Sequence, residues 1–558
     1  MRKQVLTFVL ASIVLSAACQ NTVYRPKETE TTVETVVASD IETEDSEDEK
    51  ENDNDESKTD PASDSKPALL RNETNRKKNQ YDVSIKLDDE KHTLDVEQKL
   101  HYVNNNGKTI NEIYFNLIPE AFKSKGGGLD MKSVSSDGKD LSMKQVKETV
   151  YSLPLEKELA PGESCDIHMN YTVNIPENAD RFGYFGNNYN LGNVLATPAL
   201  FENGQWLVQP YIDLGDAFYT EISDYRVKID VPNGYSIAAT GTLKDDPYVA
   251  DDVRDFAFTA SSEMMMLCEE YGDTALIVHY PKNCPNTGKH VMEVAKRSMD
   301  LFNQILGGYP YETLHLVCTS MPGSIGGMEY PGLVMLTVNS DIEDVIDLYY
   351  DRITVDQYNA KMNSTSMQGP SDSIPETDGT IETLSDSEIK NMLIYDVDSL
   401  TKSTAHEIAH QWFYGIVGND EVRYPWIDEG MCRFMEGLYC EYYNEALSSF
   451  SLFERFKSED ESIYQEFKGE VEESYPIDLN DTLYDYKKKT EDYGMIYYKG
   501  AAMIYHMYSH MGSESFFEAI SDYIKTFAYT EVTPDEFVDF WTKKGDFKEM
   551  FEVYMKDF

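Results

Sequence analysis

The chain has 558 residues, of which 41% are hydrophobic and 12% aromatic, a composition typical of a folded protein with about two to four domains. Its 100 acidic and 49 basic residues give a formal net charge of −51 at pH 7. A charge of this sign excludes nucleic acid and an anionic membrane surface as favourable partners, because both would repel the protein.

The N-terminus has the pattern of an export signal. Arg2 and Lys3 precede an apolar run over residues 5–15, and small residues then lead to Cys19. The run is shorter than the roughly 20 residues that a membrane-spanning helix needs, so residues 1–19 are predicted to be a signal peptide. The small residues before Cys19 resemble a lipobox, which predicts a lipoprotein anchored in the cell membrane and facing outward. Cleavage just before Cys19 without lipidation would instead give a secreted protein.

Two regions of different composition follow the signal. Residues 20–77 are mostly acidic and small polar, with almost no aromatic side chains. They cannot bury enough apolar surface to fold and are predicted to be a disordered acidic tether. Residues 78–272 contain short segments that alternate apolar and polar side chains, such as YDVSIKL at 81–87, separated by turn residues. We therefore expect an N-terminal β domain over residues 78–272.

The remaining residues, 273–558, have mainly helical patterns. Apolar side chains recur at helical spacing over residues 290–306. Residues 360–388 are rich in Gly, Pro, Ser and Thr and are predicted to be a polar insertion. The stretch TPDEF, which begins at Thr533, has the pattern of a capping box at a helix start. The expected fold class is α+β, with a β-rich domain followed by a mainly helical one.

The stretch TAHEIAHQWF at 404–413 contains a candidate metal site. His406 and His410 are four residues apart, so they project from one face of a helix and can reach one cation. Histidines hydrogen-bonded within a core helix are the alternative interpretation. Glu429, in WIDEG 19 residues after His410, would complete a His, His, Glu set that leaves zinc one open coordination position. Glu407 is rotated about 100° from His406, where it would lie beside a water molecule at that open position.

Three segments together resemble a known family. HEIAHQWF followed by WIDEG is similar to the metal-binding helices of the aminopeptidase N family of zinc metallopeptidases, which are gluzincins. GGMEYPG at 326–332 resembles the G-x-M-E-N exopeptidase signature of that family, and YYKGA at 497–501 resembles its Y-x-K-G motif. The segments follow the family's order from about residue 80 to residue 558. Tyr330 stands where the family usually has Asn, and the chain is similar to short bacterial forms that lack the C-terminal helical domain.

The resemblance implies a thermolysin-like catalytic domain over residues 273–558 and one Zn²⁺ per chain. It also implies a role for each matching residue. Zinc would be bound by His406, His410 and Glu429, Glu407 would act as the general base, and Tyr497 would contact the reacting carbonyl oxygen. Gly326, Gly327, Met328 and Glu329 would form the edge along which the substrate binds, with Glu329 paired to the substrate's α-ammonium group.

These expectations predict a zinc-dependent aminopeptidase that removes N-terminal residues from peptides with a free N-terminus, outside the cytoplasm. A zinc endopeptidase of the same fold is the nearest alternative. A surface-anchored binding protein built on a peptidase scaffold is an alternative of another class. Such a protein would be expected to have lost a metal ligand, the base or the tyrosine, and the sequence retains all of them.

Overall fold

The computed structural model describes residues 69–74, 76–322, 325–339, 342–350, 352–355, 357–358, 395–443, 451–469, 478–489 and 493–555. The predicted signal peptide with Cys19, the tether up to residue 68 and the insertion at 360–388 lie outside the described residues. Within the described part of the chain, no helix has both the length and the apolar character needed to cross a membrane.

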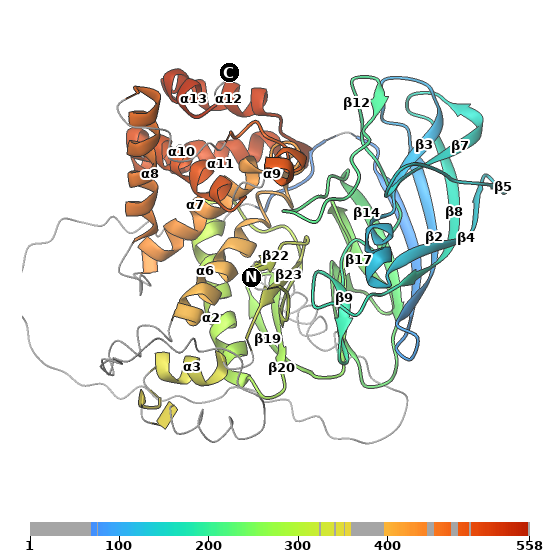
Figure 1. Ribbon diagram of the computed structural model, residues 1–558, viewed down its shortest axis with the longest axis horizontal. Coiled ribbons are helices and arrows are strands. Elements are labelled where there is room, and N and C mark those ends of the chain that lie inside the picture. The colour runs from blue at the N-terminus through green and yellow to red at the C-terminus, as the bar shows by residue number, and fades with distance from the viewer. Residues whose placement is uncertain are drawn as a thin grey trace, which may run out of the picture.

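The β-rich part of the molecule lies on one side and the helical part on the other (Figure 1). The largest sheet of the β-rich part has eight strands in the order β16-β17-β14-β1-β2-β8-β4-β5. In β1 every second side chain is buried, as the alternation of apolar and polar residues predicts, because successive side chains of a strand point to opposite faces. The strand bounds are β1 Asn79–Asp88, β2 Thr93–Val103, β4 Gly128–Ser136, β5 Lys139–Leu141, β8 Ser164–Asn174, β14 Ser223–Asp230, β16 Thr242–Leu243 and β17 Tyr248–Val253.

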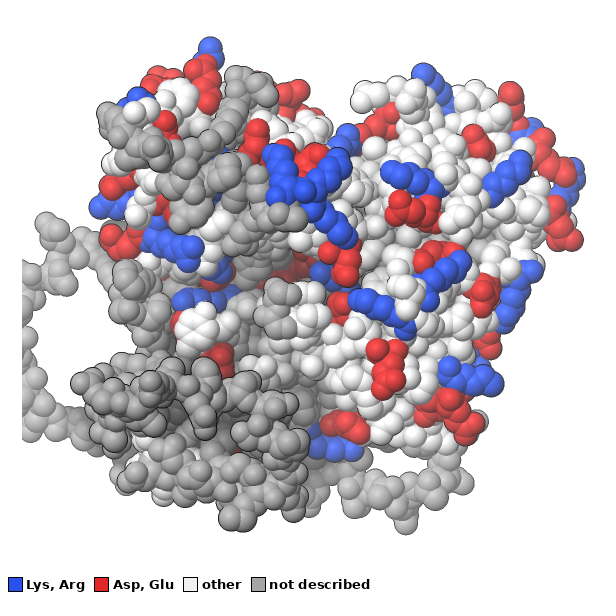
Figure 2. All heavy atoms as spheres, in the orientation of Figure 1, with Lys and Arg blue, Asp and Glu red and all other residues white. Residues whose placement is uncertain are grey.

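Two four-stranded sheets, ordered β15-β18-β10-β9 and β11-β3-β7-β6, share one apolar core with the large sheet. A short 3-10 helix, η1 Ile118–Lys125, and a hairpin of β12 Phe201–Glu202 and β13 Gln205–Trp206 complete this part. On the face shown in Figure 2, its acidic and basic side chains are interspersed. The other strands are β3 Ile110–Asn116, β6 Lys144–Lys147, β7 Val150–Leu159, β9 Phe182–Phe185, β10 Asn188–Leu191, β11 Thr197–Pro198, β15 Ser236–Ala239 and β18 Phe258–Ser261.

A five-stranded sheet, ordered β19-β20-β21-β23-β22, forms the transition to the helical part. Its strands are β19 Met264–Tyr271, β20 Thr274–Pro281, β21 Thr313–Thr319, β22 Gly327–Met328 and β23 Leu333–Thr337. Helix α2, Pro285–Leu306, connects the parallel strands β20 and β21 and includes the helix predicted at 290–306. Because β19 pairs with β20 along its whole length, it belongs to this sheet although it lies before residue 272.

The helical part packs around a second apolar core. Thr533 caps α12 with the capping box that the sequence predicts. Together with the β-rich part, these helices confirm the α+β fold class. They are α3 Ile342–Tyr349, α6 Tyr395–Ala409, α7 Trp426–Tyr443, α8 Leu452–Phe467, α9 Leu483–Lys489, α10 Met495–Met511, α11 Ser513–Phe527, α12 Pro534–Thr542 and α13 Lys548–Tyr554, with the short strands β24 Val417–Gly418 and β25 Thr530–Glu531.

The β-rich and helical parts are joined by polar and apolar contacts. The Gln209 side-chain amide donates to an Asp420 carboxylate oxygen at 2.9 Å, and Arg423 forms an ion pair with Glu202 at 2.5 Å. Beside these bonds lies a small apolar cluster of Ile212, Ala217, Val422 and Leu483. Residues 209–217 of the β-rich part therefore pack directly against the segment that precedes α7.

Candidate active site

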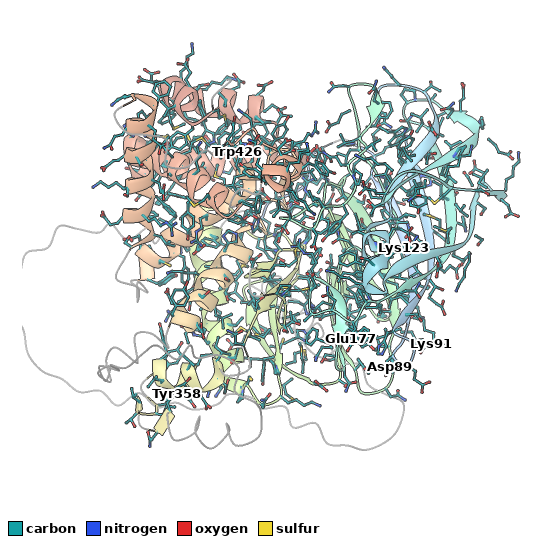
Figure 3. The ribbon with its side chains drawn as sticks, in the orientation of Figure 1. Asp89, Lys91, Lys123, Glu177, Tyr358 and Trp426 are labelled. Atoms are coloured by element: carbon teal, nitrogen blue, oxygen red, sulfur yellow. The ribbon has the colours of Figure 1, made fainter. Side chains whose placement is uncertain are left out.

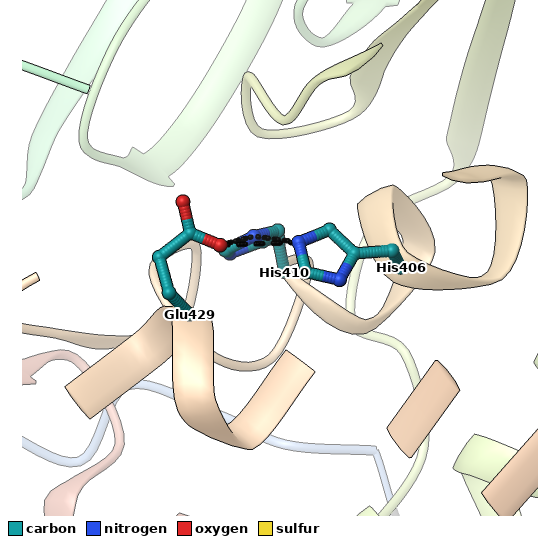
Figure 4. A group of neighbouring side chains, drawn as sticks. All are labelled: His406, His410 and Glu429. Carbon is teal, nitrogen blue, oxygen red and sulfur yellow. Dashed lines mark hydrogen bonds and ion pairs between the residues drawn. The ribbon is translucent and has the colours of Figure 1, made fainter. Parts of the chain in front are cut away.

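Three side chains from α6 and α7 converge on one point (Figure 4). The Nε2 atom of His406 lies 3.1 Å from Glu429 Oε2 and 3.2 Å from His410 Nε2. His410 Nε2 lies 3.4 Å from the same Glu429 oxygen. His410 is the first residue after α6, but its backbone N–H still donates to the carbonyl oxygen of His406, so the two rings keep the spacing of one helical turn. All three residues are buried.

The converging atoms fit a divalent cation better than they fit a set of hydrogen bonds. His410 Nδ1 lies 3.0 Å from the carbonyl oxygen of Phe413 and must donate to it, which leaves a lone pair on Nε2 of the neutral ring. Ligands at about 2.0–2.1 Å from a tetrahedral zinc are about 3.3–3.4 Å apart, close to the three separations seen here. Two imidazole nitrogens and one carboxylate oxygen are also a donor set that zinc prefers. The His, His, Glu set can therefore hold one zinc ion.

Glu436 lies behind the ring of His406. Its Oε2 atom is 3.4 Å from His406 Nδ1, which forms no other close polar contact among the described residues, and the carboxylate is also paired with Arg433. Glu436 is 1% exposed, so it is not a surface residue. An N–H on Nδ1 that faces Glu436 would leave the Nε2 lone pair directed at the metal position, which is the usual arrangement behind a metal-binding histidine.

Close packing of two helices brings Tyr497 to the site. Helix α7 begins with the buried Trp426 (Figure 3), and Gly430 one turn later contacts Gly500 of α10. A Cβ atom on Gly430 would lie 2.9 Å from the Cα of Gly500, so only glycine allows this approach. As a result the Tyr497 hydroxyl donates a hydrogen bond to Glu429 Oε1. Burial raises the pKa of Glu429, but the adjacent imidazole rings of His406 and His410 outweigh burial and hold this pKa below the ordinary value.

Glu407 lies beside the converging atoms and under the edge strand β22. A Cβ atom on Gly327 would lie 2.3 Å from Glu407 Cγ, so the glycine backbone covers the Glu407 side chain directly. Glu407 is 6% exposed, and burial raises its pKa to about 7. Gly326 is equally restricted, with a Cβ position 2.7 Å from the Ser403 hydroxyl oxygen on α6. The two glycines thus allow this edge to lie against the metal-binding helix.

Glu329 follows β22 and is 3% exposed. Burial, and then the nearby Asp216 carboxylate, raise the pKa of Glu329 well above its ordinary value. The Gln411 side chain holds the loop, since its amide donates to the Glu329 carbonyl oxygen at 3.4 Å and its Oε1 accepts from Gly332 N at 2.8 Å. The neighbouring Met328 side chain is fully buried in the apolar core, so it supports the edge from behind.

Tyr330, at the position where the family usually has Asn, points into the β-rich part. It is fully buried, and its hydroxyl donates to Asn193 Oδ1 at 2.8 Å. A Cβ atom on Gly192 would lie 1.9 Å from this hydroxyl oxygen, so the tyrosine fits only above a glycine. Tyr330 therefore fastens the loop that carries Glu329 to the β-rich part.

The sequence did not reveal two charged residues beside Glu329. Arg181 and Asp216 come from the β-rich part and form an ion pair at 2.5 Å, with side chains only 9% and 15% exposed. Burial raises the pKa of Asp216, and the Arg181 guanidinium opposes that shift. Neither residue lies in a local motif, because each reaches the site only through the packing of the β-rich part on the helical part.

A family model for the peptidase family M1 domain matches residues 381–557. This range contains the three converging residues, Glu407 and Tyr497. Residues 381–557 therefore resemble a peptidase family M1 domain. The resemblance to aminopeptidase N-like zinc metallopeptidases is confirmed by this match, and the M1 domain accounts for most of the helical part.

Curated relatives of the M1 domain include plant aminopeptidases. The chain is 25% identical over 263 residues to aminopeptidase M1-B of Oryza sativa subsp. japonica, a match that covers 45% of this chain and 23% of that protein. It is 28% identical over 143 residues to aminopeptidase M1 of Arabidopsis thaliana, which covers 24% of this chain and 14% of that protein. The chain thus spans less than a quarter of the length of these relatives.

A solved structure is similar to this chain in fold. The M1 zinc metallopeptidase from Deinococcus radiodurans matches with a TM-score of 0.51 and 14% sequence identity, over 86% of this chain and 94% of that one. The match extends beyond the residues of the family model and includes much of the β-rich part. The common fold therefore comprises a β-rich part followed by a helical part.

Proposed function

We propose that this protein is a zinc aminopeptidase that removes residues from the free N-terminus of peptides. The observation that carries the proposal is the convergence of His406, His410 and Glu429. Tyr497 donates a hydrogen bond to Glu429, and Glu407 lies close enough to both histidines that their charges act on its pKa. When bound there, zinc would supply a Lewis acid that polarises the scissile carbonyl group and activates a water molecule.

The chain's own residues would carry the protons. The Glu407 carboxylate would accept a proton from the attacking water and return it to the leaving amine, a role that needs a carboxylate beside the metal and shielded from solvent. The Tyr497 hydroxyl, which here donates to Glu429, would donate instead to the carbonyl oxygen as negative charge develops on it. Both residues come from elements that the packing of α6, α7 and α10 holds together.

Glu329 would select peptides with a free N-terminus. A buried carboxylate is costly unless a cation pairs with it, and the α-ammonium group of a peptide is such a cation. Asp216 adds negative charge nearby, while Arg181 neutralises part of it. The Tyr330 side chain points into the β-rich part and bonds Asn193, so it does not compete for the Glu329 carboxylate.

The test uses one peptide in two forms, with a free and with an acetylated N-terminus. Wild type should release residues one at a time from the free form, and acetylation should lower kcat/KM at least about tenfold, equivalent to about 1.4 kcal/mol. Glu329→Gln keeps the shape of the side chain without its charge and should remove most of this preference. For each variant, the rate on the acetylated peptide shows how far the substitution impairs the enzyme in general. Internal cuts at equal rates on both peptides would identify an endopeptidase instead.

We further propose that the protein acts outside the cytoplasm as a lipoprotein on the cell membrane. The support is the basic start, the apolar run and the small residues that precede Cys19. Expression in a bacterial host should place the wild-type chain in the membrane fraction with a fatty-acid label. Cys19→Ala should release it from that fraction, and an unlabelled wild-type chain in the soluble fraction would contradict the anchor.

A further inference from the structure

The turn after the metal-binding helix α6 fixes the second histidine. His410 Nδ1 donates to the carbonyl oxygen of Phe413 at 3.0 Å, so the position of Phe413 decides where the ring points and which nitrogen carries the proton. Tyr414, the next residue, has a φ of +102°, a backbone conformation that is strained for any residue except glycine. Strain of this kind persists only where surrounding contacts enforce it.

Two of those contacts come from the β-rich part. The Tyr414 hydroxyl donates to Asp255 Oδ2, and the Tyr414 carbonyl oxygen accepts from Arg254 Nε at 2.7 Å. A third contact is local, since the Tyr414 N–H donates to the carbonyl oxygen of Val417 at 2.8 Å. The group formed by Arg254, Asp255 and Tyr414 is called the Tyr414 clasp below. Within it, Arg254 contacts the Tyr414 backbone and Asp255 contacts the Tyr414 side chain.

Arg254 is itself fixed from several sides. It is 2% exposed, and its guanidinium donates to the carbonyl oxygen of Thr530 at 2.7 Å and to Glu531 Oε1 at 2.9 Å. A Cβ atom on Gly418 would lie 2.2 Å from Arg254 Cζ, so the guanidinium lies directly on the backbone of β24. The Tyr414 clasp is therefore a rigid, buried connection between the β17–β18 segment and the turn that carries Phe413.

We propose that Asp255 and Arg254 are positioning residues for the metal ligand His410. They hold Tyr414 in its strained conformation, which places the Phe413 carbonyl oxygen where it accepts from His410 Nδ1. The Nε2 lone pair then faces the metal without adjustment of the ring. The β-rich part would thus raise the affinity of a metal site whose ligands all belong to the helical part. This inference rests on the proposed zinc site but makes a claim that peptidase activity alone does not test.

A purely structural role for the Tyr414 clasp predicts a different result. Loss of a buried tyrosine hydrogen bond anywhere in the β-rich part lowers stability. If the clasp only fastens the two parts together, its loss should resemble the loss of such a bond elsewhere. Tyr171 offers a matched control, because its buried hydroxyl donates to Gln98 Oε1 at 2.6 Å within the large sheet.

The experiment compares Tyr414→Phe with Tyr171→Phe in the full chain. The dissociation constant for Zn²⁺ is measured by competition with a chromogenic chelator, and thermal unfolding is followed in parallel. Tyr414→Phe should weaken zinc binding about tenfold, the lower end of the effect of contacts behind metal ligands. Tyr171→Phe should leave zinc binding within about twofold of wild type at a similar loss of Tm.

Two variants of Asp255 sharpen the test. Asp255→Asn keeps an oxygen that can accept from the Tyr414 hydroxyl and should retain most of the zinc affinity. Asp255→Ala should weaken zinc binding about as much as Tyr414→Phe, and the double variant should be little worse than either one, because both break the same bond.

Zinc binding by Tyr414→Phe that equals binding by Tyr171→Phe would overturn the inference, even if the wild type is an active aminopeptidase. Conversely, a wild-type protein whose zinc affinity depends on the Tyr414 clasp but which cleaves no peptide would leave the inference intact and refute the proposed function. The two claims are thus decided by separate measurements.

Discussion

The helical and β-rich parts both reach the active site, but they contribute in different ways. The helical part supplies the three converging residues and Glu407 from the end of α6, the residue after it and the start of α7, over a stretch of 24 residues. Apart from the Arg181–Asp216 pair, the contacts of the β-rich part hold backbone segments that carry the reacting groups. It fastens the Glu329 loop through Asn193 and the His410 turn through Asp255. The residues that would carry out the reaction therefore lie close together in the sequence, whereas their alignment depends on contacts between distant residues.

The largest effect should follow from removal of a metal ligand in the helical part. Glu429→Ala deletes one of three ligands and leaves His406 and His410 with an incomplete set. Purified wild type should contain about one zinc per chain by elemental analysis, and the variant should lose both the zinc and measurable turnover. His506→Ala is the matched control, because His506 pairs with Asp460 away from the site and should retain zinc. Full zinc content in a double His406→Ala, His410→Ala variant would refute the assignment.

The next largest effect should come from Glu407→Gln. The amide keeps the packing against Gly327 but cannot carry a proton, so kcat should fall about 10²–10⁴-fold. Zinc content should remain near that of the wild type, which separates loss of the base from loss of the metal. A variant that keeps wild-type kcat would require another group to act as the base.

Tyr497→Phe should have a smaller effect that appears mainly in kcat. Its hydroxyl would stabilise charge that exists only as the reaction proceeds, so kcat should fall about 10²–10³-fold with little change in KM. Tyr498→Phe is the neighbouring control, because its hydroxyl accepts from Arg433 and its ring lies against Arg455. Equal losses of kcat in the two variants would show that the helix, rather than the Tyr497 hydroxyl, is responsible.

These effects differ in how far the sequence could predict them. The spacing of His406 and His410, the position of Glu429 and the alternation in β1 depend on geometry within one or two elements. Helical and strand periods are the same in every protein, so such features can be predicted before the fold is known. The α+β class and the convergence of the candidate ligands could be expected for this reason.

The remaining features depend on packing between distant segments. Arg254 and Tyr414 are 160 residues apart, and nothing near either residue indicates that they meet. The strained conformation of Tyr414 follows from that meeting, so local propensity could not predict it. Local sequence also does not predict that Asp216 lies beside Glu329. Nor does it predict the sheet of β19, because its strand pattern would suit any sheet and only its pairing with β20 decides.

The smallest expected effect tests the contact of the β-rich part with the Glu329 loop. Tyr330→Phe removes the hydrogen bond to Asn193 but keeps the ring that fills the space above Gly192. Loss of one buried hydrogen bond should cost about 1 kcal/mol of stability. Thermal unfolding should show a Tm lower by about 2 °C. The preference for a free over an acetylated N-terminus should fall by less than about threefold, since Glu329 keeps its charge and Gln411 still holds the loop. A loss of that preference as large as in Glu329→Gln would mean that the β-rich part determines substrate selection rather than alignment alone.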